Sequence, residues 1–123
     1  MTGTEPFEYA LIRVMPRVER GELMNAGVIL YSQRHGYLGC RIYLNSERLR
    51  VLDPAVDVAA VTAALAAIDE ACRPGRPAGQ SPGMRFRWLT ATRSTIVQPS
   101  PVHSGLTTDP AAELDHLFDE LVR

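Results

Sequence analysis

Residues 26–44 read AGVILYSQRHGYLGCRIYL, and the hairpin predicted from this stretch decides the fold. Residues 26–32 are a run of apolar and β-branched side chains, which is typical of a buried strand. Residues 37–44 alternate, so that every second side chain is apolar and lies on the same face. The four residues QRHG at 33–36 suffice to reverse the chain, and we therefore predict an antiparallel pair.

Further strands are expected before and after this hairpin. Residues 7–15, FEYALIRVM, carry apolar side chains on both faces and end at Pro16, which predicts a strand in the middle of the sheet. Residues 84–89, MRFRWL, alternate apolar residues with arginine, which predicts a half-buried strand. Residues 94–98, STIVQ, form another extended segment, so the sheet should have four to five strands.

Two helices are predicted from their caps and from the spacing of their apolar residues. Asp57 can cap a helix that runs to Cys72, with apolar positions three and four residues apart. Asp109 and Pro110 can begin a second amphipathic helix near the end of the chain. We therefore predict an α+β fold, a small and mainly antiparallel sheet with the two helices packed on one face.

The length and composition indicate one globular domain over residues 1–123. The chain has 123 residues, 46% of them hydrophobic and 22% charged, which is enough for one core and too little for two. Residues 73–83, RPGRPAGQSPG, contain three prolines and three glycines and are interpreted as a flexible surface loop within that domain.

Charge and residue usage exclude several classes of function. The 13 basic residues, all arginine, are balanced by 14 acidic ones, and a net charge of −1 makes nucleic acid an unfavourable partner. The absence of lysine excludes a lysine Schiff base and a P-loop. We find neither a secretory signal nor an apolar run long enough to cross a membrane, so a soluble cytoplasmic protein is expected.

The sequence assigns no cofactor, no metal site and no catalytic residue. Cys40 and Cys72 lie at apolar positions of a predicted strand and helix, without the CxxC or paired histidine spacing of a zinc site. The signatures of α/β-hydrolases, kinases, P-loop proteins and zinc proteases are also missing.

Gly27, inside the start of a strand, predicts a bulge or a close approach of two backbones.

Two polar stretches remain as a candidate site for an anion or for a protein partner. They begin RGELMNAG at residue 20 and RSTIVQPSPVHSG at residue 93. The candidate residues are Arg20, Glu22, Asn25, Arg93, Ser94, Thr95, Gln98 and His103. In one interpretation the arginines hold a phosphate or carboxylate, with Glu22 or His103 as acid–base groups. In the other, these side chains satisfy turn amides and solvated ion pairs.

The same stretches carry a family resemblance. YALIRVMPRVERGELMNAGVILYSQ and RFRWLTATRSTIVQPSPVHSGLTTDP resemble the bacterial Domain of Unknown Function 3037 (DUF3037) family over nearly the whole chain. The matching positions are Arg20, Gly21, Glu22, Asn25, Gly27, Val28, Arg93, Ser94, Thr95, Gln98, Ser100, Val102, His103 and Gly105. The resemblance brings no established activity, but it implies a neighbour of HipA-like kinases and hence a partner or regulator of a kinase-fold protein.

Two hypotheses about function follow. The first is a non-catalytic accessory or protein-binding module, partnered with a HipA-like kinase; an exposed strand edge would also allow a homodimer. The alternative is a small enzyme or ligand-binding domain for a phosphate- or carboxylate-bearing compound. The sequence does not decide between them.

Overall fold

The computed structural model describes residues 3–74, 80–91 and 95–123, and its strands form one antiparallel sheet. The strands of this part of the chain are β1 (Glu5–Val14), β2 (Met24–Ser32), β3 (Tyr37–Ile42), β4 (Val97–Pro99) and β5 (His103–Thr107). Their order is β3, β2, β1, and the far edge of β1 pairs with β4 at one end and β5 at the other. The predicted hairpin and the central position of the first strand are therefore confirmed.

The helices in the described part begin at polar caps. They are α1 (Ser46–Leu52), α2 (Val58–Ala71), α3 (Pro82–Leu89) and α4 (Pro110–Leu121). In each, the side chain of the preceding Asn, Asp or Ser accepts a hydrogen bond from a main-chain N–H of the first turn. The predicted caps Asp57 and Asp109 are confirmed.

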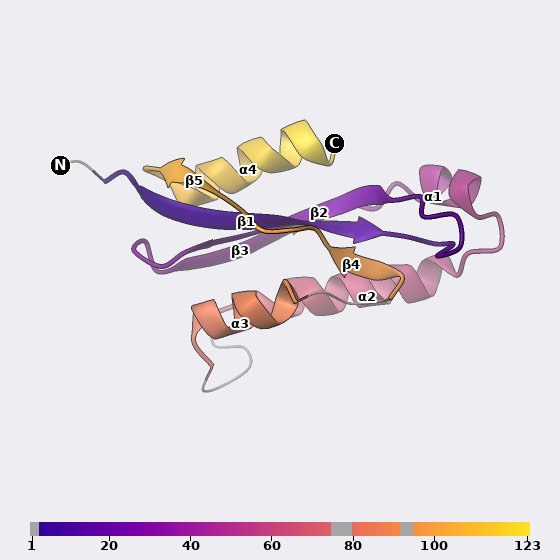
Figure 1. The fold of residues 1–123 in the computed structure, drawn as a ribbon, viewed down its shortest axis with the longest axis horizontal. Coiled ribbons are helices and arrows are strands. Elements are labelled where there is room, and N and C mark those ends of the chain that lie inside the picture. Colours follow the sequence, from indigo (N-terminus) through magenta and orange to yellow (C-terminus); the bar gives the residue numbers. More distant parts are fainter. Residues whose placement is uncertain (1–2, 75–79, 92–94) are drawn as a thin grey trace.

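The helices lie on both faces of the sheet, so the prediction of two helices on one face was wrong. Figure 1 shows α4 on one side of the strands and α2 and α3 on the other. Val28 and Leu30 of β2 pack with Phe118 of α4, whereas Ile29 belongs to the core under α2 and α3. Because β2 is apolar on both faces, each face needs a covering helix.

The prediction of a strand at residues 84–89 was also wrong, because this segment forms helix α3. Ser81 accepts a hydrogen bond from the N–H of Met84, and Pro82 stands in the first turn, where its missing N–H costs nothing. The helix buries Phe86 and Leu89, three residues apart, and leaves Met84 and Trp88 60% and 64% exposed. The alternation of apolar residues and arginine was therefore coincidental.

Strand β5 lies in the polar stretch that begins at residue 93, where no strand was predicted beyond residue 98. β4 and β5 follow the same edge of β1 and are interrupted at Ser100, whose N–H donates to the main-chain oxygen of Leu11 (2.8 Å). The Ser100 Oγ in turn accepts from the N–H of Leu11 (2.7 Å), and the side chain is buried. This serine therefore continues the hydrogen bonding of the sheet between the two short strands.

The predicted role of Gly27 is confirmed. The register of β1 with β2 shifts between Ile12 and Arg13, which marks a β-bulge. A Cβ on Gly27 would lie 2.8 Å from the main-chain oxygen of Arg41 in β3. Only glycine fits at this position without moving the neighbouring strand.

Candidate functional site

Part of the predicted site lies on the face of the sheet that carries α4. Helix α4 packs mainly against β2 and β3. Asn25, Arg13 and Gln98 lie in register across the sheet there. We call Arg13, Asn25, Gln98, Tyr9 and His103 the polar half-face.

Arg20 and Glu22 lie in the turn between β1 and β2 and are already paired with each other. Nε of Arg20 donates to Oε1 of Glu22 (2.7 Å), and Nη2 donates to Oε2 (3.2 Å). This bidentate hydrogen bonding raises the pKa of Arg20 and lowers the pKa of Glu22. Glu22 is therefore charged at neutral pH and poorly suited to act as a general acid.

Asn25 connects the sheet to the last helix. Its Nδ2 donates to the main-chain oxygen of Leu121 (2.9 Å), at the end of α4, where main-chain carbonyls lack partners within the helix. This bond fixes the end of α4 on β2. It gives Asn25 a structural role that sequence reasoning had left open.

Thr95 and Gln98 hold the turn that enters β4. Nε2 of Gln98 donates to the main-chain oxygen of Thr95 (2.7 Å), and Oγ1 of Thr95 donates to the main-chain oxygen of Val97 (2.5 Å). Arg93 and Ser94, predicted for the same site, lie outside the described residues.

His103 is exposed and stands over Tyr9, with ring centroids 5.3 Å apart. Tyr9 pairs with His103 and Arg13 pairs with Gln98, and four residues of strand separate the two pairs. At about 3.3 Å per residue this separation is about 13 Å. The described candidate residues thus lie spread along the sheet, too far apart for one small anion to contact both Gln98 and His103.

The two thiols contribute no nucleophile. Cys72 is buried in the core below α2, and the Cys40 side chain packs against the same core. A hydrogen bond with Cys72, together with burial, raises the pKa of Cys40 far above its ordinary value. Cys40 is therefore a protonated thiol at neutral pH, and sulfur nucleophiles react as thiolates.

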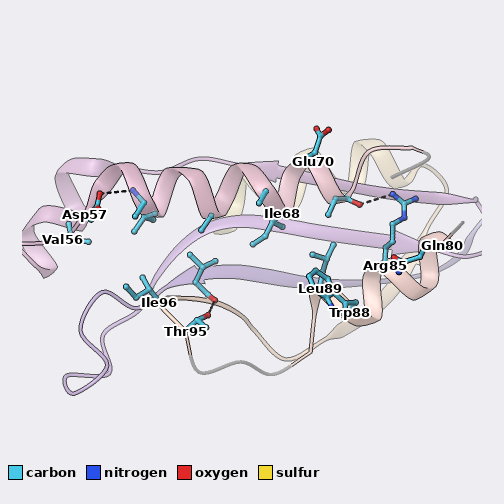
Figure 2. Close-up of a pocket in the computed structure, with 16 residues that line it drawn as sticks. Val56, Asp57, Ile68, Glu70, Gln80, Arg85, Trp88, Leu89, Thr95 and Ile96 are labelled. Carbon is cyan, nitrogen blue, oxygen red and sulfur yellow. Dashed lines mark hydrogen bonds between the residues drawn. The ribbon is translucent and has the colours of Figure 1, made fainter. Parts of the chain in front are cut away.

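The described surface has a groove that the sequence did not predict. It has a volume of about 1360 Å³ and runs between α2 on one side and α3 and residues 95–97 on the other (Figure 2). We call it the α2–α3 groove. Its α2 wall exposes Ala60, Ala64 and Ala67, and its opposite wall carries Trp88 and Ile96, which are 64% and 43% exposed.

Among the described residues, charged side chains line this groove only towards its ends. At one end Asp57 accepts a hydrogen bond from the N–H of Ala60 (3.0 Å) and so caps α2. At the other end Nη1 of the buried Arg85 donates to the main-chain oxygens of Ala71 (3.0 Å) and Arg73 (2.5 Å), which ties α3 to the end of α2. The middle of the groove is apolar, and Figure 2 shows Trp88 and Leu89 beside it.

A family model described as a protein of unknown function (DUF3037) matches residues 9–122. The chain belongs to the DUF3037 family. No curated protein and no solved structure matches it. The predicted resemblance is confirmed, but membership in DUF3037 names no reaction, ligand or partner, so function has to be argued from the surface of the molecule.

Several residues of the two stretches that resemble DUF3037 have structural roles in this member of the family. A Cβ on Gly105 of β5 would lie 2.8 Å from the ring of Phe7, much as Gly27 lies against Arg41. Ser100 bridges β4 and β5, and Asn25 holds α4. Packing or hydrogen bonding within the fold therefore accounts for these four positions of the pattern.

The described part of this DUF3037 chain offers no metal centre, since no group of three or more His, Cys, Asp or Glu side chains gathers within it. Among the same residues, no helix has the length and apolar character needed to cross a membrane.

Proposed function

We propose that this DUF3037 protein is a non-catalytic protein-binding module and that the α2–α3 groove is its docking surface. The groove itself carries the proposal. Large apolar hollows with exposed aromatic side chains mark interaction sites on soluble proteins, and tryptophan is prominent among the residues that contribute most to binding. Trp88 is the single tryptophan of the chain and it lies on the groove wall.

The dimensions favour a polypeptide as the occupant. Typical small-molecule pockets enclose roughly 300–1,000 Å³, and the groove is larger, at about 1360 Å³. It follows the 14 residues of α2, which correspond to a length of about 21 Å. An amphipathic helix of about four turns has this length, and its apolar face would meet the middle of the groove, where the described lining residues are uncharged.

The alternative, a site for a phosphate- or carboxylate-bearing compound, receives less support. Such a site needs guanidinium groups that are available to the ligand. Arg20 is paired with Glu22, and Arg87 donates to both carboxylate oxygens of Glu8 (2.9 and 2.8 Å). The buried Arg85 is bonded to main-chain carbonyls.

A HipA-like kinase, implied by the family resemblance, is the partner we propose, with both proteins in the cytoplasm. The test is co-expression of the two proteins and purification through a tag on this chain. Ala64→Asp places a charge in the groove, and Ala63→Asp is its matched control, because Ala63 is an exposed alanine of the same helix that does not line the groove. We expect Ala64→Asp to lose the kinase and Ala63→Asp to retain it. Equal retention by both variants would refute the groove as the docking surface.

A further inference from the structure

A second cavity lies beside the first turn of α3 and shares no described lining residue with the α2–α3 groove. It has a volume of about 430 Å³ and lies between α3, the start of β1 and the turn that follows β2. Pockets for small molecules enclose roughly 300–1,000 Å³, so a small ligand fits it. We call it the Tyr31 cavity and propose that it binds a small monocarboxylate with an apolar body. The inference goes beyond the proposed docking function and does not depend on it.

Three polar side chains that line the Tyr31 cavity form no hydrogen bond within the described residues. They are the phenol of Tyr31, the amide of Gln33 and the guanidinium of Arg34. All three can donate to an oxyanion, and the fork of a guanidinium matches the two oxygens of a carboxylate. Tyr31 is half-buried, and a tyrosine hydroxyl in such a place usually has a partner. A bound carboxylate would supply that partner.

The charges around the cavity favour an anion with a single negative charge. Nη1 and Nη2 of Arg87 donate to the two carboxylate oxygens of Glu8 (2.9 and 2.8 Å), so these two lining residues neutralise each other. Arg34 is then the charged residue of the described lining that has no counter-ion. A carboxylate would balance Arg34, whereas the second charge of a phosphate monoester would be repelled by Glu8.

The walls of the cavity provide room for the hydroxyl and contacts for an apolar body. A Cβ on Gly83 would lie 2.8 Å from the hydroxyl oxygen of Tyr31, so the glycine leaves this group its place beside α3. Met84, which is 60% exposed, and Pro6 line the cavity with apolar surface. Methionine adapts its shape to a ligand and makes favourable contacts with aromatic rings. An aromatic carboxylate therefore suits both parts of the cavity.

NMR titration of isotope-labelled protein tests the inference, with benzoate as the probe and benzamide as its uncharged isostere. We expect benzoate to shift the main-chain amide signal of Gly83 to saturation at millimolar concentration. Benzamide should bind about fivefold more weakly, the ratio expected for an ion pair that stays in contact with water. Arg34→Gln should reduce the affinity for benzoate by the same factor and leave benzamide unchanged. Arg50→Gln is the matched control, because Arg50 is an exposed arginine that lines neither the groove nor this cavity.

Tyr31→Phe removes only the hydroxyl and should weaken benzoate severalfold, while Tyr43→Phe, at an exposed tyrosine outside the cavity, should not. Ala64→Asp, which alters the docking groove, should bind benzoate as the wild type does, so the two proposals can fail separately. Benzoate that binds no more tightly than benzamide would overturn the inference, as would equal affinities of Arg34→Gln and the wild type. The absence of any saturable shift, or tighter binding of phenyl phosphate than of benzoate, would overturn it as well.

Discussion

Removal of the side chain should cost much more stability at Phe86 than at Trp88 of α3, although the two are only two residues apart in the sequence. Phe86 is fully buried and its ring stacks on Tyr31 with centroids 5.4 Å apart, whereas Trp88 is 64% exposed. In a strand, both side chains would point to the same face and both would be buried. In the helix only Phe86 is buried, and the resulting difference in stability between the two variants can be measured.

The expected loss in the free energy of unfolding follows from how deeply each side chain is buried. Replacing a buried phenylalanine with alanine typically lowers the free energy of unfolding by about 3–5 kcal/mol, through lost transfer energy and the cavity left behind. For a domain of 123 residues this corresponds to a fall in Tm of roughly 12–20 °C. Trp88→Ala removes a side chain that is mostly in water, so its effect should stay within about 0.5 kcal/mol.

Urea denaturation followed by circular dichroism measures both variants against the wild type. Because domains of this size are stable by only about 5–15 kcal/mol, Phe86→Leu serves as a milder variant that retains a folded protein. We expect Phe86→Leu to be less stable than Trp88→Ala. Equal destabilisation by the alanine variants at both positions would refute the helical assignment of residues 82–89 and, with it, the α3 wall of the groove.

Three further predictions concern the sheet and the core. Ser100→Ala should lower the free energy of unfolding by about 1–3 kcal/mol, because a main-chain N–H of β1 loses its acceptor, whereas the exposed Ser104→Ala should change it little in the same urea titration. Gly27→Ala should cost about 1–3 kcal/mol, since its Cβ meets the main-chain oxygen of Arg41, and a fall in Tm by calorimetry would confirm this. The pKa of Cys40 is raised in the folded state, so its contribution to stability is fully present below the ordinary thiol pKa of about 8.5. As the pH rises above that value, the unfolded state loses the thiol proton while the folded state keeps it, and the free energy of unfolding falls. Stability measured from about pH 7 to about pH 10 should therefore fall more in the wild type than in Cys40→Ala.

The elements with a clear local pattern could be predicted from the sequence. The hairpin of β2 and β3 follows from an apolar run, a short turn and an alternating segment. Asp57 and Asp109 mark the beginnings of α2 and α4, because a carboxylate next to an apolar helical repeat satisfies the first N–H groups. Gly27 indicates a close approach of two strands, because a glycine inside an apolar strand leaves room for a neighbouring backbone.

The remaining elements depend on contacts that no local pattern contains. Residues 84–89 alternate like a strand, but the Ser81 cap and Pro82 begin a helix that tertiary packing of Phe86 stabilises. Strand β5 is short and polar, and it forms because β1 offers an unpaired edge. The groove could not be predicted either, since it arises only after α3 turns Trp88 outward beside the alanines of α2.

Several of the candidate site residues make hydrogen bonds to other parts of the protein. Asn25 and Gln98 are bonded to main-chain oxygens, and Arg20 is paired with Glu22. Composition alone cannot tell such bonds from ligand contacts, because the same polar groups serve both. Among the candidates that the structure describes, the role of His103, exposed on the polar half-face, is least explained by its contacts.

The fluorine NMR signal of Trp88 in an assembled complex tests the docking groove most directly. The chain has one tryptophan, so incorporation of 5-fluorotryptophan gives a single resonance that reports on the groove even when the partner has tryptophans of its own. We expect this resonance to shift and to lose its sensitivity to solvent when the kinase binds. A complex that forms while the Trp88 resonance stays at the position of the free monomer would contradict the account.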